Sequence, residues 1–293
     1  MPLDTRMVGE STRTFSHDVD ARWLMAYAAG LGDFNPTYMD TEAHTVCAHP
    51  VFPVCLEWPV ILSSRELPGY ESTTPEEGAR GVHAAHDLHL YRPIRAGETL
   101  TTTATIISLK AIRPGAAQMT RLDTTDASGD LVCRTYQLGI SRGVAVTGAA
   151  TEVEAPPALP VRPSGEQLAS LPIEVGAGAA HVYTECARIF NPIHTDRAVA
   201  LAAGLPDIIL HGTATLALCV SRIVETACGG DPTAVVRVSG DFRAMVPMPS
   251  TLALRTARVA DGIHFDCLVA GGETAIRGGF VGLRGDSPPS GMA

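Results

Sequence analysis

Two histidines and a glycine stand in the second half of the chain at a spacing that could do chemistry on a carbonyl compound. His194 ends the tight polar turn Asn191-Pro192-Ile193-His194, and His211-Gly212 precedes the long apolar stretch 213–224. A helix that starts at Gly212 would present unpaired backbone N–H groups at the positive end of its dipole. Such groups can polarise a carbonyl oxygen, and a histidine beside them can move a proton. This arrangement suits a thioester or another carbonyl substrate.

The elements around these residues can be inferred from the local pattern. The segment T-A-T-L-A-L-C-V-S-R-I-V is apolar almost all round, so we expect a buried helix. A glycine at its start lets a ligand oxygen come close to the backbone. A short helix from Asp196 to Ala203 should lie between the turn and this long helix. We expect Asp196, and Asp40 in the first half, to cap the helices that they begin.

An internal repeat organises the whole chain. Asn35-Pro36-Thr37-Tyr38-Met39-Asp40 matches Asn191-Pro192-Ile193-His194-Thr195-Asp196 at an offset of 156 residues. The segment L-Y-R-P-I-R-A-G-E-T-L, ending at Leu100, similarly matches F-R-A-M-V-P-M-P-S-T-L, ending at Leu252, at an offset of 152. Two matches in the same order indicate a duplicated unit of roughly 150 residues.

Each copy reads as helices followed by strands. In the first copy the helix 54–66, interrupted by Pro59, precedes strand-like segments rich in β-branched residues. These predicted strands are 83–94, 99–110, 119–125 and 131–140, and in the second copy 172–175, 234–242, 251–259, 264–270 and 274–283. One long apolar helix wrapped by an antiparallel sheet, present twice, predicts an α+β double hot-dog. We expect one unit over 1–145, a proline-rich linker over 146–165 and the second unit over 166–293.

Composition excludes several classes of function. The chain has 293 residues, 45% of them hydrophobic, and a net charge of −9, so we expect a full core and no nucleic-acid partner. No run is long enough for a membrane span, and the N-terminus lacks the apolar core of a signal peptide. The seven scattered cysteines form no C-x-x-C pair and should be buried, reduced side chains. We expect a cytoplasmic protein without a cofactor, with a homodimer as its assembly.

The residues quoted above resemble the MaoC-like, or hydratase 2, family of R-specific enoyl-CoA hydratases and dehydratases. The family motif is of the type D-x-N-P-[IL]-H-x-D, followed by H-G at the start of the central helix. Asn191, Pro192, Ile193, His194 and Asp196 match the motif, and His211-Gly212 match the later pair. The resemblance covers nearly the whole chain and implies that water is added to, or removed from, an α,β-unsaturated acyl thioester. The substrate would be bound to CoA or to an acyl carrier protein.

The chain departs from the family pattern at the aspartate. That position is Ile189 in the second copy, and a hydrocarbon side chain cannot exchange a proton. The first copy has the acid as Asp33, but Tyr38 stands at the histidine position. Phe52-Pro53 replaces the H-G pair there, so no glycine amide is available. Each half therefore carries only part of the site.

By resemblance, the second half performs the chemistry and the first half serves the acyl chain. His194 would move the proton and Gly212 would polarise the thioester carbonyl, whereas Asn191 could act in the site or simply shape its turn. His194 would work alone or with a substitute acid, for which Glu185 and Tyr183 are candidates. We expect the remaining motif residues to line the substrate site: His211, Ile189, Pro192, Asp33 and Tyr38. A site shared between Asp33 and His194 is disfavoured, because paired hot-dog sites lie at opposite ends of their interface.

Three further histidines, His83, His86 and His89, lie on one predicted strand. No fourth ligand accompanies them, so we expect a solvated strand face and not a metal site.

Three functions follow from the pattern. The first is a hydratase or dehydratase acting on an acyl thioester. Because Ile189 replaces the usual acid, the second is another hot-dog reaction, such as a thioesterase, an isomerase or a cyclisation catalyst. The third is a non-catalytic acyl-binding subunit that receives the missing acid from another chain.

Overall fold

The computed structural model describes residues 2–71, 73–78, 80–162 and 169–285. Residues 163–165 of the expected linker lie outside these ranges, as do 166–168 and 286–293 of the expected second unit.

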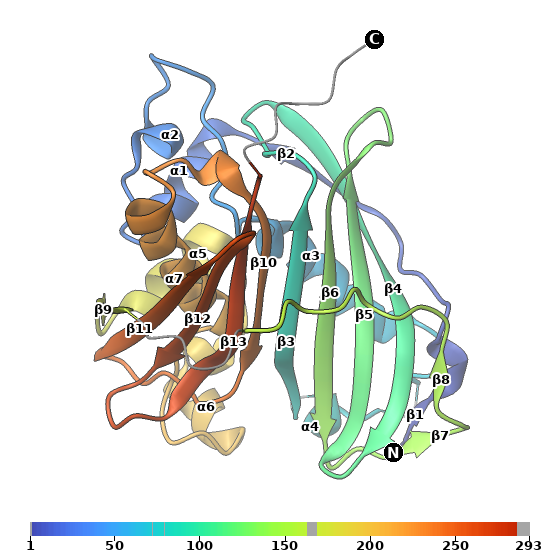
Figure 1. Ribbon diagram of the computed structural model, residues 1–293. Helices are drawn as coiled ribbons and strands as arrows, with labels where there is room; N and C mark the ends of the chain where they lie inside the picture. Colours follow the sequence, from blue (N-terminus) through green and yellow to red (C-terminus); the bar gives the residue numbers. More distant parts are fainter. Residues whose placement is uncertain (1, 72, 79, 163–168, 286–293) are drawn as a thin grey trace.

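The duplicated plan is visible in the order of the elements (Figure 1). Each half begins with an edge strand, continues through helices that include one long central helix, and ends with four strands. The first half contains β2 (Phe15–Val19), α1 (Ala21–Gly30), α2 (Pro36–Met39), α3 (Pro53–Ser63), α4 (Pro75–Gly78), β3 (Gly81–Leu90), β4 (Glu98–Ile112), β5 (Gly115–Thr125) and β6 (Leu131–Arg142). The second half contains β9 (Ala169–Val175), α5 (Ala179–Ala187), α6 (Arg197–Ala202), α7 (Gly212–Ala227), β10 (Val235–Phe242), β11 (Ser250–Val259), β12 (Gly262–Leu268) and β13 (Thr274–Leu283).

The strands of both halves join in one 11-stranded antiparallel sheet. Its order is β2-β4-β5-β6-β3-β10-β13-β12-β11-β9, with β8 (Thr151–Glu152) pairing to β4. The order is symmetric about the β3–β10 pair, where Leu88 lies opposite Val238 and His86 opposite Gly240. We call this pair the seam. At the seam, the edge strand of one half's sheet pairs with the edge strand of the other half's sheet, so neither edge is left open there.

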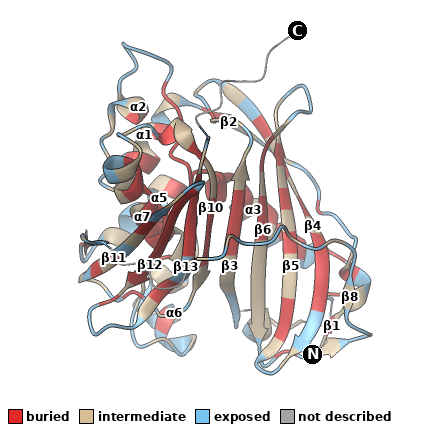
Figure 2. Cartoon of the chain, in the orientation of Figure 1, coloured by how far each residue is buried: buried red, intermediate tan, exposed pale blue. Residues whose placement is uncertain are grey.

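The helices cover one face of this sheet, and the core fills the space between them (Figure 2). Leu56 of α3 and Leu216 of α7 are fully buried in one continuous core. α3 runs through Pro59 without a break, although we expected an interruption there. The burial of its side chains stabilises α3 by more than is lost with the single backbone hydrogen bond that Pro59 cannot donate.

The two halves meet at residues that are equivalent in the repeat. The Tyr27 and Tyr183 rings lie 5.8 Å apart, and Gly30 packs so closely on Cys186 that an added Cβ would lie 2.8 Å from the cysteine Cβ. Both pairs have the repeat offset of 156 residues, so each residue meets its own counterpart, as expected at a pseudo-twofold axis.

The expected solvated strand of histidines is wrong. His86 is 2% exposed and His83 is half-buried, because β3 lies at the middle of the sheet between β6 and β10. A bulge between His83 and Ala85 brings the His83 and His86 rings within 5.3 Å of each other.

The segment after β8 crosses the outer face of the sheet (Figure 1). Glu154 accepts a hydrogen bond from the Tyr136 hydroxyl on β6 and pairs with Arg121 on β5. Farther on, the Ala158 carbonyl accepts from Arg237 on β10. β7 (Val146–Thr147), which precedes this segment, pairs in parallel with β1 (Leu3–Asp4).

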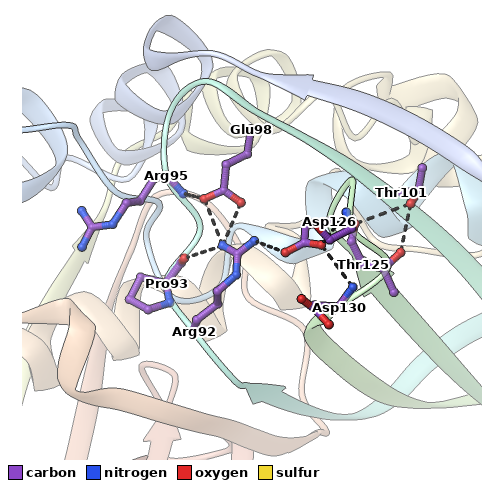
Figure 3. Close-up of polar contacts among 9 residues, drawn as sticks. Arg92, Pro93, Arg95, Glu98, Thr101, Thr125, Asp126 and Asp130 are labelled. Carbon is purple, nitrogen blue, oxygen red and sulfur yellow. Dashed lines mark hydrogen bonds and ion pairs between the residues drawn. The ribbon is translucent and has the colours of Figure 1, made fainter. Parts of the chain in front are cut away.

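Arg92 fixes the connection between β3 and β4 (Figure 3). Its guanidinium donates to Glu98 at 2.8 Å and to Asp126, in the turn between β5 and β6, at 3.0 Å. These two contacts join the β3–β4 connection to the β5–β6 turn. Arg92 and Glu98 both belong to the segment ending at Leu100 that matches the one ending at Leu252.

Asp196 caps α6 as expected, accepting from the Ala198 and Val199 amides. Asp40 makes the same type of contact with the Glu42 and Ala43 amides, but a turn and not a helix follows it. All seven cysteines are free, and five of them are buried.

Candidate active site

The start of α7 is the electrostatic centre of the site. Gly212 is the first helical residue, and no side chain caps the helix at His211. The amides of the first turn therefore keep their partial positive charge for a ligand. A Cβ on residue 212 would lie 3.0 Å from the Phe242 ring, so only glycine fits without displacing this neighbour.

The motif turn lies between α5 and α6. α5 ends at Arg188, which adopts a left-handed conformation with φ of 58°, and the Ile189 amide then donates to the Thr184 carbonyl. Asn191 and Pro192 lead into a single 3₁₀ turn in which the His194 amide donates to the Asn191 carbonyl at 3.1 Å. The Asn191 side chain makes no capping bond.

His194 is held in one tautomer by the segment before α7. Its Nδ1 lies 2.8 Å from the Ile209 carbonyl, which can only accept a hydrogen bond. The proton of the neutral ring is therefore on Nδ1, and Nε2 carries a lone pair. Burial lowers the pKa of His194, with the bond to Ile209 acting in the opposite direction. His194 is thus neutral near pH 7 and can accept a proton.

His211 stacks on His194, with ring centroids 3.7 Å apart and an interplanar angle of 26°. His211 is 2% exposed, and its Nε2 lies 3.2 Å from the Thr184 hydroxyl. Burial and, secondarily, the neighbouring His194 lower the pKa of His211 to about 2, with the Ile189 backbone opposing. His211 is therefore neutral near pH 7 and packs against the His194 ring.

Of the two substitute acids, the structure brings Tyr183 to the site. Its hydroxyl donates to the Thr213 hydroxyl at 3.1 Å, and its ring centroid lies 5.0 Å from that of His211. The Tyr27 hydroxyl of the first half is 3.4 Å away. Burial raises the pKa of Tyr183, so this group is a neutral hydroxyl. Glu185 is exposed on α5.

Ile189 lies at the family's aspartate position and is 5% exposed within the main core. Its side chain supplies shape but no proton. Pro192 is exposed at the start of the 3₁₀ turn.

The first-half turn lies at the other end of α7. Asp33 accepts from the Asn35 amide at 3.2 Å, and the Asn35 side-chain amide donates to the Gly230 carbonyl at 2.6 Å. Asp33 and Asn35 also line a cleft of about 680 Å³ together with Glu225. Glu225 lies 13 residues beyond Gly212, or about 20 Å along a helix. The structure therefore does not bring Asp33 to His194.

Tyr38 is fully buried, and its ring lies 5.7 Å from that of His49. α3 begins at Pro53, which has no N–H to offer. The first half thus lacks both the free histidine nitrogen and the glycine amide of the second.

Sequence reasoning did not place Phe242 and His83 beside the site. The Phe242 ring contacts Gly212, and the His83 ring centroid lies 4.8 Å from that of Phe242. β3 and β10 are far apart in sequence, and only their pairing at the seam puts these side chains together.

Within the described residues, no group of three or more His, Cys, Asp or Glu side chains could hold a metal ion. None of the helices described is long and apolar enough to cross a membrane.

Comparison with known proteins gives matches in both halves of the chain. Residues 162–277 match the MaoC-like domain, and residues 6–135 match the FAS1-like dehydratase domain region. The chain is 24% identical over 286 residues to the peroxisomal enoyl-CoA hydratase 2 of Arabidopsis thaliana, with 90% of each chain covered.

Two solved structures share the fold. A MaoC-like dehydratase from Phytophthora capsici superposes with a TM-score of 0.82 at 21% identity, covering 96% of this chain and 98% of that one. A Mycobacterium tuberculosis protein described as a double hotdog superposes with a TM-score of 0.60 at 15% identity, covering 94% and 96%. The predicted double hot-dog fold is confirmed: the second half of the chain carries a MaoC-like domain, and the first half carries a FAS1-like dehydratase region.

Proposed function

We propose that the second half of this chain catalyses the addition of water to an α,β-unsaturated acyl thioester, or the reverse elimination. The observation that carries the proposal is the state of His194. Its Nδ1–H is bound to the Ile209 carbonyl, its Nε2 has no hydrogen-bond partner among the residues that the structure describes, and it lies beside the uncapped start of α7.

In the proposed reaction, the thioester carbonyl accepts a hydrogen bond from the Gly212 amide. His194 Nε2 takes a proton from water while the water oxygen bonds to C3 of the enoyl group. The electrons of the C2–C3 double bond move toward the carbonyl oxygen, which the Gly212 amide holds as an enolate. The enolate re-forms the carbonyl, and C2 takes a proton, so water is added across the double bond.

The transfer of a proton to C2 is the step for which the aspartate that is missing here would normally be available. We propose that His194, protonated in the first step, returns its proton, with Tyr183 as the alternative donor. Tyr183 is supported by its hydrogen bond to Thr213, one residue after the proposed carbonyl-binding amide. Asn191 is proposed to shape the turn, and Ile189, Pro192 and His211 to line the substrate side.

The proposed substrate is a 2-enoyl-CoA, supported by the enoyl-CoA hydratase 2 relative, with a carrier-protein thioester as the other form. The first half would hold the acyl chain. We further propose a homodimer and, since all seven cysteines are free, a reducing compartment such as the cytoplasm.

The test is hydration of crotonyl-CoA and longer 2-enoyl-CoAs, followed as loss of the enoyl absorbance. His194→Ala should lower kcat about 10²- to 10⁴-fold, the usual contribution of one positioned proton-transfer group. His44→Ala is the matched control, because His44 is exposed in the first half and its Nε2 bonds the Thr37 carbonyl of α2, away from the proposed site. Equal activity of His194→Ala and wild type would refute this site.

The apolar environment of Ile189 favours one alternative, another reaction on the same fold. Release of free thiol from saturated acyl-CoAs would identify a thioesterase. If Ile189→Asp strongly raised hydration, the native reaction would be something other than hydration. A non-catalytic subunit would be excluded by His194-dependent turnover of the chain purified alone.

A further inference from the structure

The inner face of the first-half sheet carries a row of polar side chains where a hydrocarbon lining would be expected. At one end of this row, the Tyr70 hydroxyl donates a hydrogen bond to Gln118 at 2.6 Å, and the Gln118 side-chain amide donates to the Thr120 hydroxyl at 3.1 Å. Thr120 lies opposite Gln137 across the β5–β6 pair, and Gln137 lies opposite His86 across the β6–β3 pair. We call these five residues the polar row.

The row faces the helix layer. Directly opposed residues of neighbouring strands point to the same face of a sheet. Thr135, two residues before Gln137 on β6, bonds Glu57 of α3, and Leu122, two residues after Thr120, packs with Val60 of the same helix. The polar row therefore lies in the space between the sheet and the helices.

One end of the row is unsatisfied. Both ring nitrogens of His86 and the side-chain oxygen of Gln137 are buried without a hydrogen-bond partner among the described residues. The other end is satisfied internally by Tyr70, Gln118 and Thr120. Buried polar atoms are nearly always paired in native proteins, so a neighbouring pair of unsatisfied side chains points to a missing partner.

The unsatisfied end lies close to the proposed reaction site. Gly240 lies opposite His86, and a Cβ on it would be 3.9 Å from Leu216, one helical turn after Gly212. In the other direction, the His86 ring lies 5.3 Å from His83, which contacts the Phe242 ring beside Gly212. Through these contacts the unsatisfied end is joined, along the seam, to the side chain that packs on Gly212.

We propose that His86 and Gln137 bind a hydroxyl group carried on the acyl chain beyond C3, so that the preferred substrate is an acyl thioester with a hydroxyl in addition to the one that the reaction itself adds or removes. This inference rests on the proposed function and names the substrate class of that same site. A hydroxyl both donates and accepts, so it can donate to the Gln137 oxygen or one His86 nitrogen and accept from the other nitrogen. A methylene chain would leave all three atoms unpaired.

A neutral group fits better than a carboxylate. Burial lowers the pKa of His86 to about 4, with the Asp87 charge opposing, so the ring is uncharged near pH 7. A neutral imidazole offers a carboxylate no compensating charge in a buried site.

The experiment compares the binding of saturated acyl-CoA probes, so that it does not depend on turnover. Decanoyl-CoA and the isomeric hydroxydecanoyl-CoAs with one hydroxyl at successive chain positions from C4 onward are titrated calorimetrically into wild type, His86→Phe and His89→Phe. We expect one hydroxylated isomer to bind wild type about tenfold more tightly than decanoyl-CoA, the value of one well-placed buried hydrogen bond. His86→Phe should remove this preference while retaining decanoyl-CoA binding.

His89→Phe is the matched control, because His89 lies on the same strand but bonds Asp87 on the outer face. The His89→Phe variant should still bind the hydroxylated acyl-CoA more tightly than decanoyl-CoA. If wild type binds every isomer no better than decanoyl-CoA, the proposal is overturned, and buried water is the partner of His86. Crotonyl-CoA hydration by wild type is measured separately, so that failure of the hydratase proposal is distinguished from failure of the hydroxyl proposal.

Discussion

The stacked pair His194 and His211 decides which charge states the site can hold. Two imidazolium rings at a centroid distance of 3.7 Å would repel each other, and burial already opposes either charge. Thr184 bonds the His211 ring, and the Ile209 carbonyl bonds the His194 ring. The pair is therefore a neutral unit in which His194 offers the accepting nitrogen.

This charge state predicts the pH profile. Catalysis needs His194 neutral, and burial lowers its pKa below the ordinary 6.5. We expect kcat/KM for enoyl-CoA hydration to fall toward acid pH with a midpoint below 6.5. Initial rates at a series of pH values, with folding monitored by circular dichroism, measure the profile. An acid limb centred at or above 6.5 would contradict the assigned environment.

Gly212 gives a second prediction at the residue scale. In Gly212→Ala the new Cβ would lie 3.0 Å from Phe242, so the ring or the helix start must move. A misplaced amide should lower kcat/KM about 10²-fold. Phe242→Leu in the same chain should restore part of the loss by making room.

The control is Gly176→Ala, where no atom lies within 4 Å of the added Cβ. It should leave kcat/KM unchanged. Full activity in Gly212→Ala would mean that the helix start does not hold the carbonyl.

At the scale of elements, the two central helices have diverged. α7 starts at a glycine and has open amides, whereas α3 starts at Pro53 and cannot donate there. α3 instead carries the fully buried Glu57, which shares a hydrogen bond with Thr135 of β6. Burial raises the pKa of Glu57 to about 7, with the Thr135 bond opposing.

Glu57 predicts a pH-dependent stability. The folded chain holds this proton up to about pH 7, whereas the unfolded chain releases it near 4.5. Raising the pH between these values therefore lowers wild-type stability. Glu57→Gln should match wild type below pH 4.5 and exceed its free energy of unfolding by up to about 3 kcal/mol above pH 7.

Urea unfolding across this pH range measures the difference. Glu10→Gln, at an exposed position, should have the same free energy of unfolding as wild type across this pH range. A Glu57→Gln variant no more stable than wild type at pH 8 would mean that the carboxylate is stabilised in the fold.

For the whole molecule, the seam between β3 and β10 makes the halves one structure. Asp87 of β3 accepts two hydrogen bonds from Arg237 of β10, both at 2.8 Å, and the two side chains are only 10% and 16% exposed. The crossing segment adds the Ala158 carbonyl to the same arginine. We infer that the chain unfolds as one cooperative unit.

Breaking this ion pair should destabilise both halves together. Arg237→Met leaves the buried Asp87 with His89 as its remaining side-chain partner and no guanidinium, and should cost about 3–5 kcal/mol. Tryptophan fluorescence and far-ultraviolet circular dichroism during urea unfolding should shift together. Arg197→Met, at an exposed pair with Asp207, should cost less than about 1 kcal/mol. Separate transitions for the two signals would show that the halves unfold independently.

Local pattern and repeat were enough to predict the fold. The period of the strands, the apolar helices and the two matched turns predict a duplicated helix-and-sheet unit, and the structure has it. The exceptions are informative. Pro59 does not break α3, and the histidines of β3 are not on a solvated face, because burial within the assembled sheet overrides the local preference of each segment.

The sequence alone determined the family motif, with His194 and the His211-Gly212 pair in their spacing, and the loss of the usual acid at Ile189. Only the tertiary structure decided which other groups stand beside them. Tyr183 and Tyr27 meet at the pseudo-twofold axis, and His83 and Phe242 meet at the seam. Sequence spacing fixes neighbours within one helix or turn, whereas contacts between strands depend on pairing and register across more than a hundred residues.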